Sequence, residues 1–303
     1  MVKPLAKDSG VYSGIDKETF FASPLWFVLV AAVLWSTGGL FIKSTSLNGF
    51  ELTFWRSLLA ALTVMFFTRR EGYGFNRVTL LASVMYAALL LLFVFATIWT
   101  TAANAIFLQY TAPVYVLLLE PVLYKEKFRS RDLLVIAACV AGMSLFFVGK
   151  LRPQDVDGNL AALASGVCFA CYFLLLRHPQ SRLVNKASSV IYGNLLLAFA
   201  CSYAGVKALP KMSAQDAGIV LFLGVVQIGL AYTFFTIGMS RGARSLDAGI
   251  VGYIEPVLNP LWVFIFIGER PSTWALAGGS IIILAVICHT LYGARKVMRE
   301  RMA

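Results

Sequence analysis

Charged side chains are scarce in this chain, and their scarcity excludes most soluble architectures. Only 14% of the 303 residues are Asp, Glu, Lys or Arg, whereas 59% are hydrophobic. Soluble domains are typically about 25% charged and about 45–50% apolar. So few charges cannot keep so much apolar surface dissolved in water. We therefore expect much of that surface to face lipid.

Signals for catalysis, metal binding and nucleotide binding are also missing. The two histidines, His178 and His289, lack metal-ligand spacing, and the CxxC of Cys168 and Cys171 sits in an apolar run without a second pair. All five cysteines fall in apolar segments, which argues against a disulfide framework. No Walker phosphate loop occurs. We expect no enzyme activity, no metal, no cofactor and no direct use of ATP.

The N-terminal 22 residues carry charges but no apolar core and no small-residue cleavage site. This pattern indicates a tail rather than a cleaved signal peptide. The formal net charge of +11 could suggest nucleic acid as a partner. Membrane topology explains the charge better, as the distribution of Lys and Arg shows.

Ten apolar runs are the dominant feature of the remaining sequence. About 20 apolar residues cross a hydrocarbon core of about 30 Å as a helix, so ten crossings use roughly two thirds of the chain. We predict an all-α integral membrane protein with ten transmembrane helices. The runs are 24–42, 51–68, 78–98, 102–124, 132–149, 158–177, 187–206, 215–239, 245–267 and 273–293.

The loops between these runs alternate in basic charge. With the N-terminus placed in the cytoplasm, 19 Lys and Arg residues fall on the cytoplasmic side and six on the outer side, with Arg56 inside a helix. Cytoplasmic loops are enriched in Lys and Arg. The bias predicts cytoplasmic N- and C-termini and an even number of crossings.

The chain contains an internal repeat at an offset of 143 residues. It pairs Tyr110 with Tyr253, Pro113 with Pro256, and Glu126 with Glu269. These residues lie in and just after the fourth and ninth runs, so the repeat unit is five helices. An odd unit forces the second copy to insert upside down, which is typical of secondary transporters. The predicted organisation is a cytoplasmic tail, two inverted repeats and a second cytoplasmic tail, at 1–22, 23–150, 158–293 and 294–303.

Three charged residues inside the apolar runs are candidates for function. Glu255 lies near mid-membrane, where a carboxylate costs about 3 kcal/mol on insertion scales and usually lines a cavity or pairs within the bundle. It could bind a substrate ammonium, carry a coupling proton, or only cap backbone groups freed by Pro256. Arg56 could attract a carboxylate or brace helix ends. Glu120 lies nearer the cytoplasmic edge and fits a structural anchor or gate.

Neutral polar and aromatic residues in the runs are candidates for the wall of a central cavity. Amides and hydroxyls in a bundle also bond neighbouring helices, and aromatic rings also pack, so each has a structural alternative. Pro113 and Pro256 permit kinks that are either hinges or static bends. The cavity candidates, with Glu255, are Trp35, Ser36, Tyr86, Phe93, Tyr110, Tyr172, Gln227, Tyr232, Tyr253 and Asn259.

Several of these motifs together resemble a known family. Each half ends in a helix with an early proline and a Glu followed by a basic residue; the first helix reads LWSTGGLFIK, and Arg56 lies in FWRSLLAAL. Over residues 24–293 the chain resembles the drug/metabolite transporter superfamily, EamA type, and within it the bacterial YddG exporters of aromatic amino acids. Two residues depart from the family's pattern. Ser36 stands where many relatives have Gly, and Ala112 stands in the first repeat where Glu255 stands in the second.

The resemblance implies a ten-helix basket around a central cavity, with the fifth and tenth helices peripheral. It also implies a bacterial inner-membrane protein that exports small metabolites by alternating access. We expect aromatic or apolar amino acids as substrates, with a nucleotide-sugar carrier or broad drug exporter as the alternative. A lipid-modifying membrane enzyme would need a cluster of Asp, His or Cys at one membrane face, and a channel would need a continuous polar stripe. The sequence shows neither.

Overall fold

Apolar runs become helices in this chain because a helix satisfies its own backbone N–H and C=O groups, for which lipid offers no partners. The computed structural model describes residues 24–124, 130–148, 153–185, 187–241, 243, 248 and 251–302. The predicted tail 1–22 and Glu126 lie outside these residues. Longer helices in the described ranges are α2 Pro24–Ser36, α3 Gly38–Ser44, α4 Gly49–Thr68, α5 Arg77–Trp99, α6 Ala102–Gln109, α7 Ala112–Tyr124, α8 Ser130–Ser144, α9 Pro153–Arg177, α10 Ala187–Ala200, α11 Ser202–Ala208, α12 Ala214–Leu221, the π-helix η5 Phe222–Leu230, α13 Ala231–Ser240, α15 Ile254–Ile267 and α16 Thr273–Met302.

Each of the ten predicted apolar runs contains helix, which confirms the all-α membrane class. Within the described ranges, six helical stretches are long and apolar enough to cross a membrane, and α10 with α11, bent by 66°, can supply a seventh. Three shorter apolar helices occupy the other runs, at Leu133–Phe147, Ile254–Ile267 and Thr273–Cys288. Ten crossings therefore stays a prediction.

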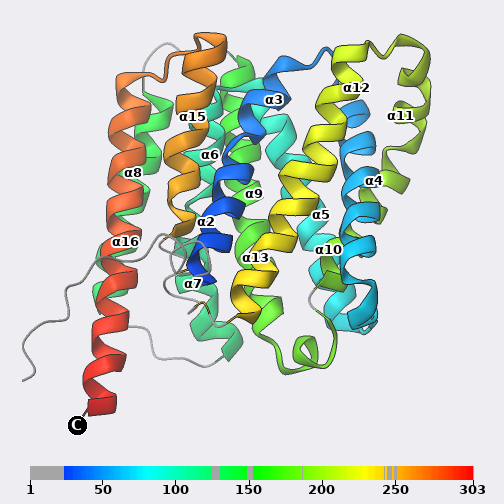
Figure 1. Cartoon of the computed structure of the whole chain (residues 1–303). Coiled ribbons are helices and arrows are strands. Elements are labelled where there is room, and N and C mark those ends of the chain that lie inside the picture. Colours follow the sequence, from blue (N-terminus) through cyan, green and yellow to red (C-terminus); the bar gives the residue numbers. More distant parts are fainter. Residues whose placement is uncertain are drawn as a thin grey trace, which may run out of the picture.

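Two helices lie together at one edge of the bundle (Figure 1). These are α8 and α16, the fifth and tenth predicted helices, and they pack mainly against each other; α16 also contacts α6, and α8 also contacts α7. Gly142 of α8 and Gly278 of α16 bring their backbones together: a Cβ on Gly278 would lie 2.5 Å from the Gly142 carbonyl oxygen. Small residues permit such close approach between membrane helices. Beyond its apolar part α16 continues through the predicted cytoplasmic tail to Met302.

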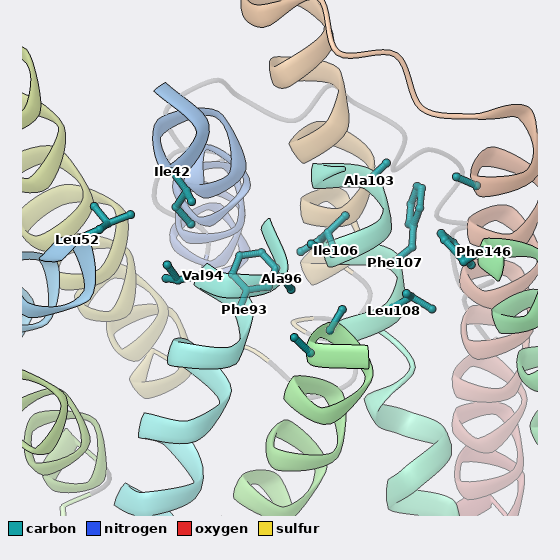
Figure 2. Packing of buried hydrophobic residues seen from close by; sticks show 14 of the residues in the cluster. Ile42, Leu52, Phe93, Val94, Ala96, Ala103, Ile106, Phe107, Leu108 and Phe146 are labelled. Atoms are coloured by element: carbon teal, nitrogen blue, oxygen red, sulfur yellow. The ribbon is translucent and has the colours of Figure 1, made fainter. Parts of the chain in front are cut away.

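A hydrophobic core fills the interior near one end of the bundle, and Figure 2 shows part of it. Ile42, Leu52 and Val94 pack there with residues of α6, and the rings of Phe107 and Phe146 lie 6.1 Å apart. Phe93, predicted to line a cavity, is 9% exposed and belongs to this core. The structure therefore places Phe93 with the packing residues.

Both predicted fourth helices of the repeats are interrupted at a tyrosine. α6 ends at Gln109 and α7 begins at Ala112, while α15 begins at Ile254 directly after Tyr253. Pro113 and Pro256 lie in the first turn of the new helix, where the missing N–H costs nothing because it would have no intrahelical partner. The two prolines thus start helices rather than bend them.

The first helix and the eighth helix carry the other irregularities. The first breaks at Thr37, between α2 and α3, and the eighth contains the nine-residue π-helix η5. Wide turns of this kind are frequent at functional sites. Gly224 and Gly229 of η5 rest on α4, because a Cβ at Gly224 would lie 2.7 Å from the Arg56 carbonyl oxygen.

Replacing Gly278 by Leu tests the close contact between α8 and α16. The added side chain would meet the Gly142 carbonyl and the Phe146 ring, and overpacking of this kind costs about 2 kcal/mol. We expect a lower midpoint of thermal unfolding for the purified variant in detergent. Gly218→Leu is the matched control, since no atom lies within 4 Å of a Cβ at Gly218. Equal midpoints for the two variants would contradict the contact.

Candidate functional site

The two interrupted fourth helices meet at a hydrogen bond between Tyr110 and Glu255. The Tyr110 hydroxyl lies 2.8 Å from Glu255 Oε2 and 3.1 Å from the Gly252 carbonyl oxygen. The rings of Tyr110 and Tyr253 lie 5.8 Å apart. The repeat partners Tyr110 and Tyr253 are therefore neighbours in space, and an ionisable carboxyl group lies between the two halves. We call Tyr110, Gly252, Tyr253 and Glu255 the junction.

A second polar group lies one turn further along α15. Asn259 follows Glu255 by four residues, which places both on one face of the helix. Both its amide atoms are buried and lack a hydrogen-bond partner in the described ranges. Gly39 makes room for it, because a Cβ at Gly39 would lie 2.2 Å from Asn259 Oδ1. The LWSTGG segment of the first helix therefore lies against Asn259.

The break in the first helix is held by contacts from two other helices. Trp262 Nε1 donates to Ser36 Oγ at 3.0 Å, and Gln227 Nε2 of η5 donates to the Trp35 carbonyl at 3.2 Å. The Ser36 hydroxyl in turn donates to Val33 at 2.6 Å. The structure thus brings together Trp35, Ser36, Gln227 and Asn259, which were predicted from three separate places in the sequence. Trp262 was missed, since nothing separates it from an ordinary packing tryptophan.

The remaining aromatic candidates gather in another part of the bundle. The rings of Tyr86 and Tyr172 lie 5.2 Å apart, and the Tyr172 hydroxyl is 3.3 Å from that of Ser189. Tyr232 packs against the same apolar cluster as Tyr86. These three tyrosines come from α5, α9 and α13 and form an aromatic wall with polar tips.

Ion pairs tie the two halves together at both ends of the bundle. Lys43, just inside the end of α3, has its Nζ 2.6 Å from Glu269 Oε2 and 2.7 Å from the Thr100 carbonyl oxygen, and Glu269 Oε1 accepts from the Ala102 N–H at 2.8 Å. At the other end, Glu120 of α7 pairs with Arg177 of α9. Each pair joins the first helix of one predicted repeat to the fourth helix of the other.

The ion pairs give Glu120 a partner and add residues that sequence reasoning missed. The sequence does not single out Lys43 or Arg177 from the other basic residues at helix ends, because the partner of each is far away along the chain. Only packing reveals the pairings.

A double-mutant cycle on Lys43 and Glu269 measures the strength of the tie at the α3 end. We expect a coupling free energy of about 1 kcal/mol between Lys43→Met and Glu269→Gln, since both side chains are only partly exposed. Thermal unfolding of the single and double variants gives this value. The control is a second cycle on Glu269→Gln and Arg270→Gln, in which the changes in unfolding free energy should add. Additivity in both cycles would rule out an energetic tie between Lys43 and Glu269.

Curated relatives of this chain are transporters over most of its length. An uncharacterized transporter of Archaeoglobus fulgidus is 27% identical and aligns over 86% of this chain and 93% of its own. The pseudopaline exporter CntI of Pseudomonas aeruginosa is 25% identical over 80% and 87%, and the biotin transporter of Salmonella typhimurium is 24% identical over 81% and 83%. None of these three is a YddG exporter, so that finer resemblance stays a prediction.

A solved structure and a family model agree with this relationship. A crystal structure with 20% sequence identity covers 89% of this chain and 98% of its own with a TM-score of 0.61, which supports the fold. The model of the EamA-like transporter family matches twice, at residues 22–148 and 157–291. Two consecutive matches indicate duplicated halves. The chain therefore belongs to the EamA-like transporter family, whose members are transporters and not enzymes.

Proposed function

We propose that this transporter is a secondary exporter of aromatic or apolar amino acids. Two inverted repeats would rock around a central site between them, in a bacterial inner membrane with both termini in the cytoplasm. The observation that carries the proposal is the junction, where a membrane-buried carboxyl group from one half is held by a tyrosine of the other.

The position of Glu255 fits a carrier better than a static brace. Glu255 lies in the first turn of α15, just after the interruption. Half-helix ends near mid-membrane are where secondary transporters bind substrate and coupling ions. The hydrogen bond from the Tyr110 hydroxyl holds the Glu255 carboxylate in one orientation. A carboxylate so placed binds a substrate ammonium, and exchange of a proton for that ammonium would couple the two fluxes.

The surroundings favour an aromatic or apolar solute. Tyr110 and Tyr253 at the junction, Trp35 at the first helix and the wall of Tyr86, Tyr172 and Tyr232 supply aromatic faces with few polar atoms. Small-molecule sites are typically apolar with a few placed polar groups. The relatives named for pseudopaline and for biotin differ in cargo, so the substrate has to be argued from these side chains.

The ion pairs at the two ends support alternating access. In this structure the halves are joined at one end by Lys43 and Glu269 and at the other by Glu120 and Arg177. Opening toward either side of the membrane requires the halves to separate at that end. Pairs near the solvent are worth little, so each is weak enough to break in turn.

Flux in proteoliposomes tests the function. We expect saturable transport of phenylalanine and tryptophan that exceeds transport of aspartate and lysine, and at least a tenfold loss in Glu255→Gln because the carboxylate charge is gone. Radiolabelled uptake with and without a pH gradient is the measurement. Glu51→Gln is a matched control, since Glu51 only completes the N-terminal cap of α4.

The same experiment separates the two roles of Glu255. Wild-type flux that follows the pH gradient, with that dependence lost in Glu255→Gln, assigns the coupling proton to this residue. A gradient dependence that survives in the mutant limits Glu255 to substrate binding. Absence of flux above empty vesicles for every amino acid would refute the substrate proposal and make nucleotide sugars and cationic drugs the next panel.

A further inference from the structure

Arg56 is a buried cation in the interior of the bundle. It lies on α4, seven residues after the helix begins at Gly49, which is about 10 Å along a helix of about 30 Å. Its side chain is 2% exposed. Gly224 of η5 packs against the α4 backbone at this residue and shields it from that side.

Two nitrogens of this guanidinium have no hydrogen-bond partner among the described residues. Nε and Nη2 of Arg56 are buried and make no hydrogen bond with any group in the described ranges. The hydroxyls of Thr53 and Ser57, on the same stretch of α4, are also buried and unbonded there. A buried charge without partners costs several kcal/mol. Packing alone gives no reason to retain such a group.

Charges with a structural role in this chain are saturated, in contrast. Lys43 contacts both Glu269 and the Thr100 carbonyl. Asp216, whose side chain is as little exposed to solvent as that of Arg56, accepts hydrogen bonds from Thr45, Ser46 and Ser213 at 2.6–2.9 Å. Among the described residues, Arg56 interacts electrostatically with the Tyr86 phenol, which also interacts with Asn194, and no acidic side chain there acts on Arg56.

The two unbonded nitrogens of Arg56 lie on the same edge of its guanidinium group. Nε–H and the adjacent Nη2–H point in the same direction, and their spacing matches the two oxygens of a carboxylate. We propose that the Nε–Nη2 edge of Arg56 is the subsite for the carboxylate of the transported solute, with Thr53 and Ser57 as further donors. This inference rests on the proposed export of small metabolites and names the group that the solute must carry.

A carboxylate fits this subsite better than a phosphate. Arg56 is the only buried Arg or Lys among the residues whose exposure the structure describes, and one cation balances one negative charge. A phosphate carries up to two charges and is usually met by several cations or by a helix N-terminus. The single guanidinium therefore also argues against the nucleotide-sugar alternative.

Binding of simple carboxylates tests the subsite without requiring transport. We expect 3-phenylpropionate to raise the thermal unfolding midpoint of the purified full-length protein, while uncharged 3-phenylpropionamide and inorganic phosphate do not. Arg56→Gln should weaken 3-phenylpropionate binding on the order of a hundredfold, because its carboxylate loses a charged two-point partner. Arg56→Lys should retain part of the affinity, and Arg70→Gln, an exposed arginine on the same helical hairpin, should retain all of it.

Transport separates a subsite from a structural role. In proteoliposomes, phenylalanine should compete at least tenfold better than phenylalaninamide in the wild type, and Arg56→Gln should raise the KM for phenylalanine to that of the amide. A merely structural arginine would lower the amount of folded protein without changing this ratio. The wild-type comparison stands even where a variant does not fold.

Different results overturn different proposals. Equal binding of 3-phenylpropionate and its amide by the wild type, stabilisation by phosphate, or undiminished preference for the acid in Arg56→Gln would each overturn the carboxylate subsite. Carboxylate binding that depends on Arg56, without flux of any amino acid, would support the subsite and refute amino acid export. Flux that ignores the carboxylate would refute the subsite and leave export standing.

Discussion

The hydrogen bond between Tyr110 and Glu255 joins the two halves of this molecule where both of their fourth helices are interrupted. Interrupted helices are tolerated at membrane depth only where protein or enclosed water satisfies the freed backbone groups. Here the Tyr110 hydroxyl contacts the Gly252 carbonyl as well as the carboxylate. The same contact thus serves the backbone of one half and orients an ionisable group between both.

Around this contact, some polar side chains have hydrogen-bond or ion-pair partners and others keep buried polar atoms without one. The first-helix break is held by Trp262 and Gln227, and the ends of the bundle are held by ion pairs. Within the described ranges, Asn259, Arg56 and the side-chain oxygen of Gln227 keep buried polar atoms without a hydrogen-bond partner. The bonded atoms explain how the helices stay together, and the unbonded ones are the basis of the proposed recognition of a solute.

Proline and glycine make these arrangements sterically possible. Pro113 and Pro256 start new helices at positions where an N–H is not needed. Gly39 and Gly224 let Asn259 and the α4 backbone come within reach of their neighbours. The close approach of backbones substitutes for the hydrophobic effect, which does not drive helix association in lipid.

The sequence by itself determined the membrane class, the positions of the helices and the pairing of Tyr110 with Tyr253 as repeat partners, because apolar runs and a fixed offset are local patterns. It also indicated Glu255, since a carboxylate inside an apolar run is costly wherever it points. Only the tertiary structure decided that Glu255 meets Tyr110, that Phe93 packs in the core and that Lys43 pairs with Glu269. It also decided that Arg56 has no acidic partner among the described residues. These outcomes depend on which faces of distant helices meet, and helical periodicity fixes a face without naming its neighbour.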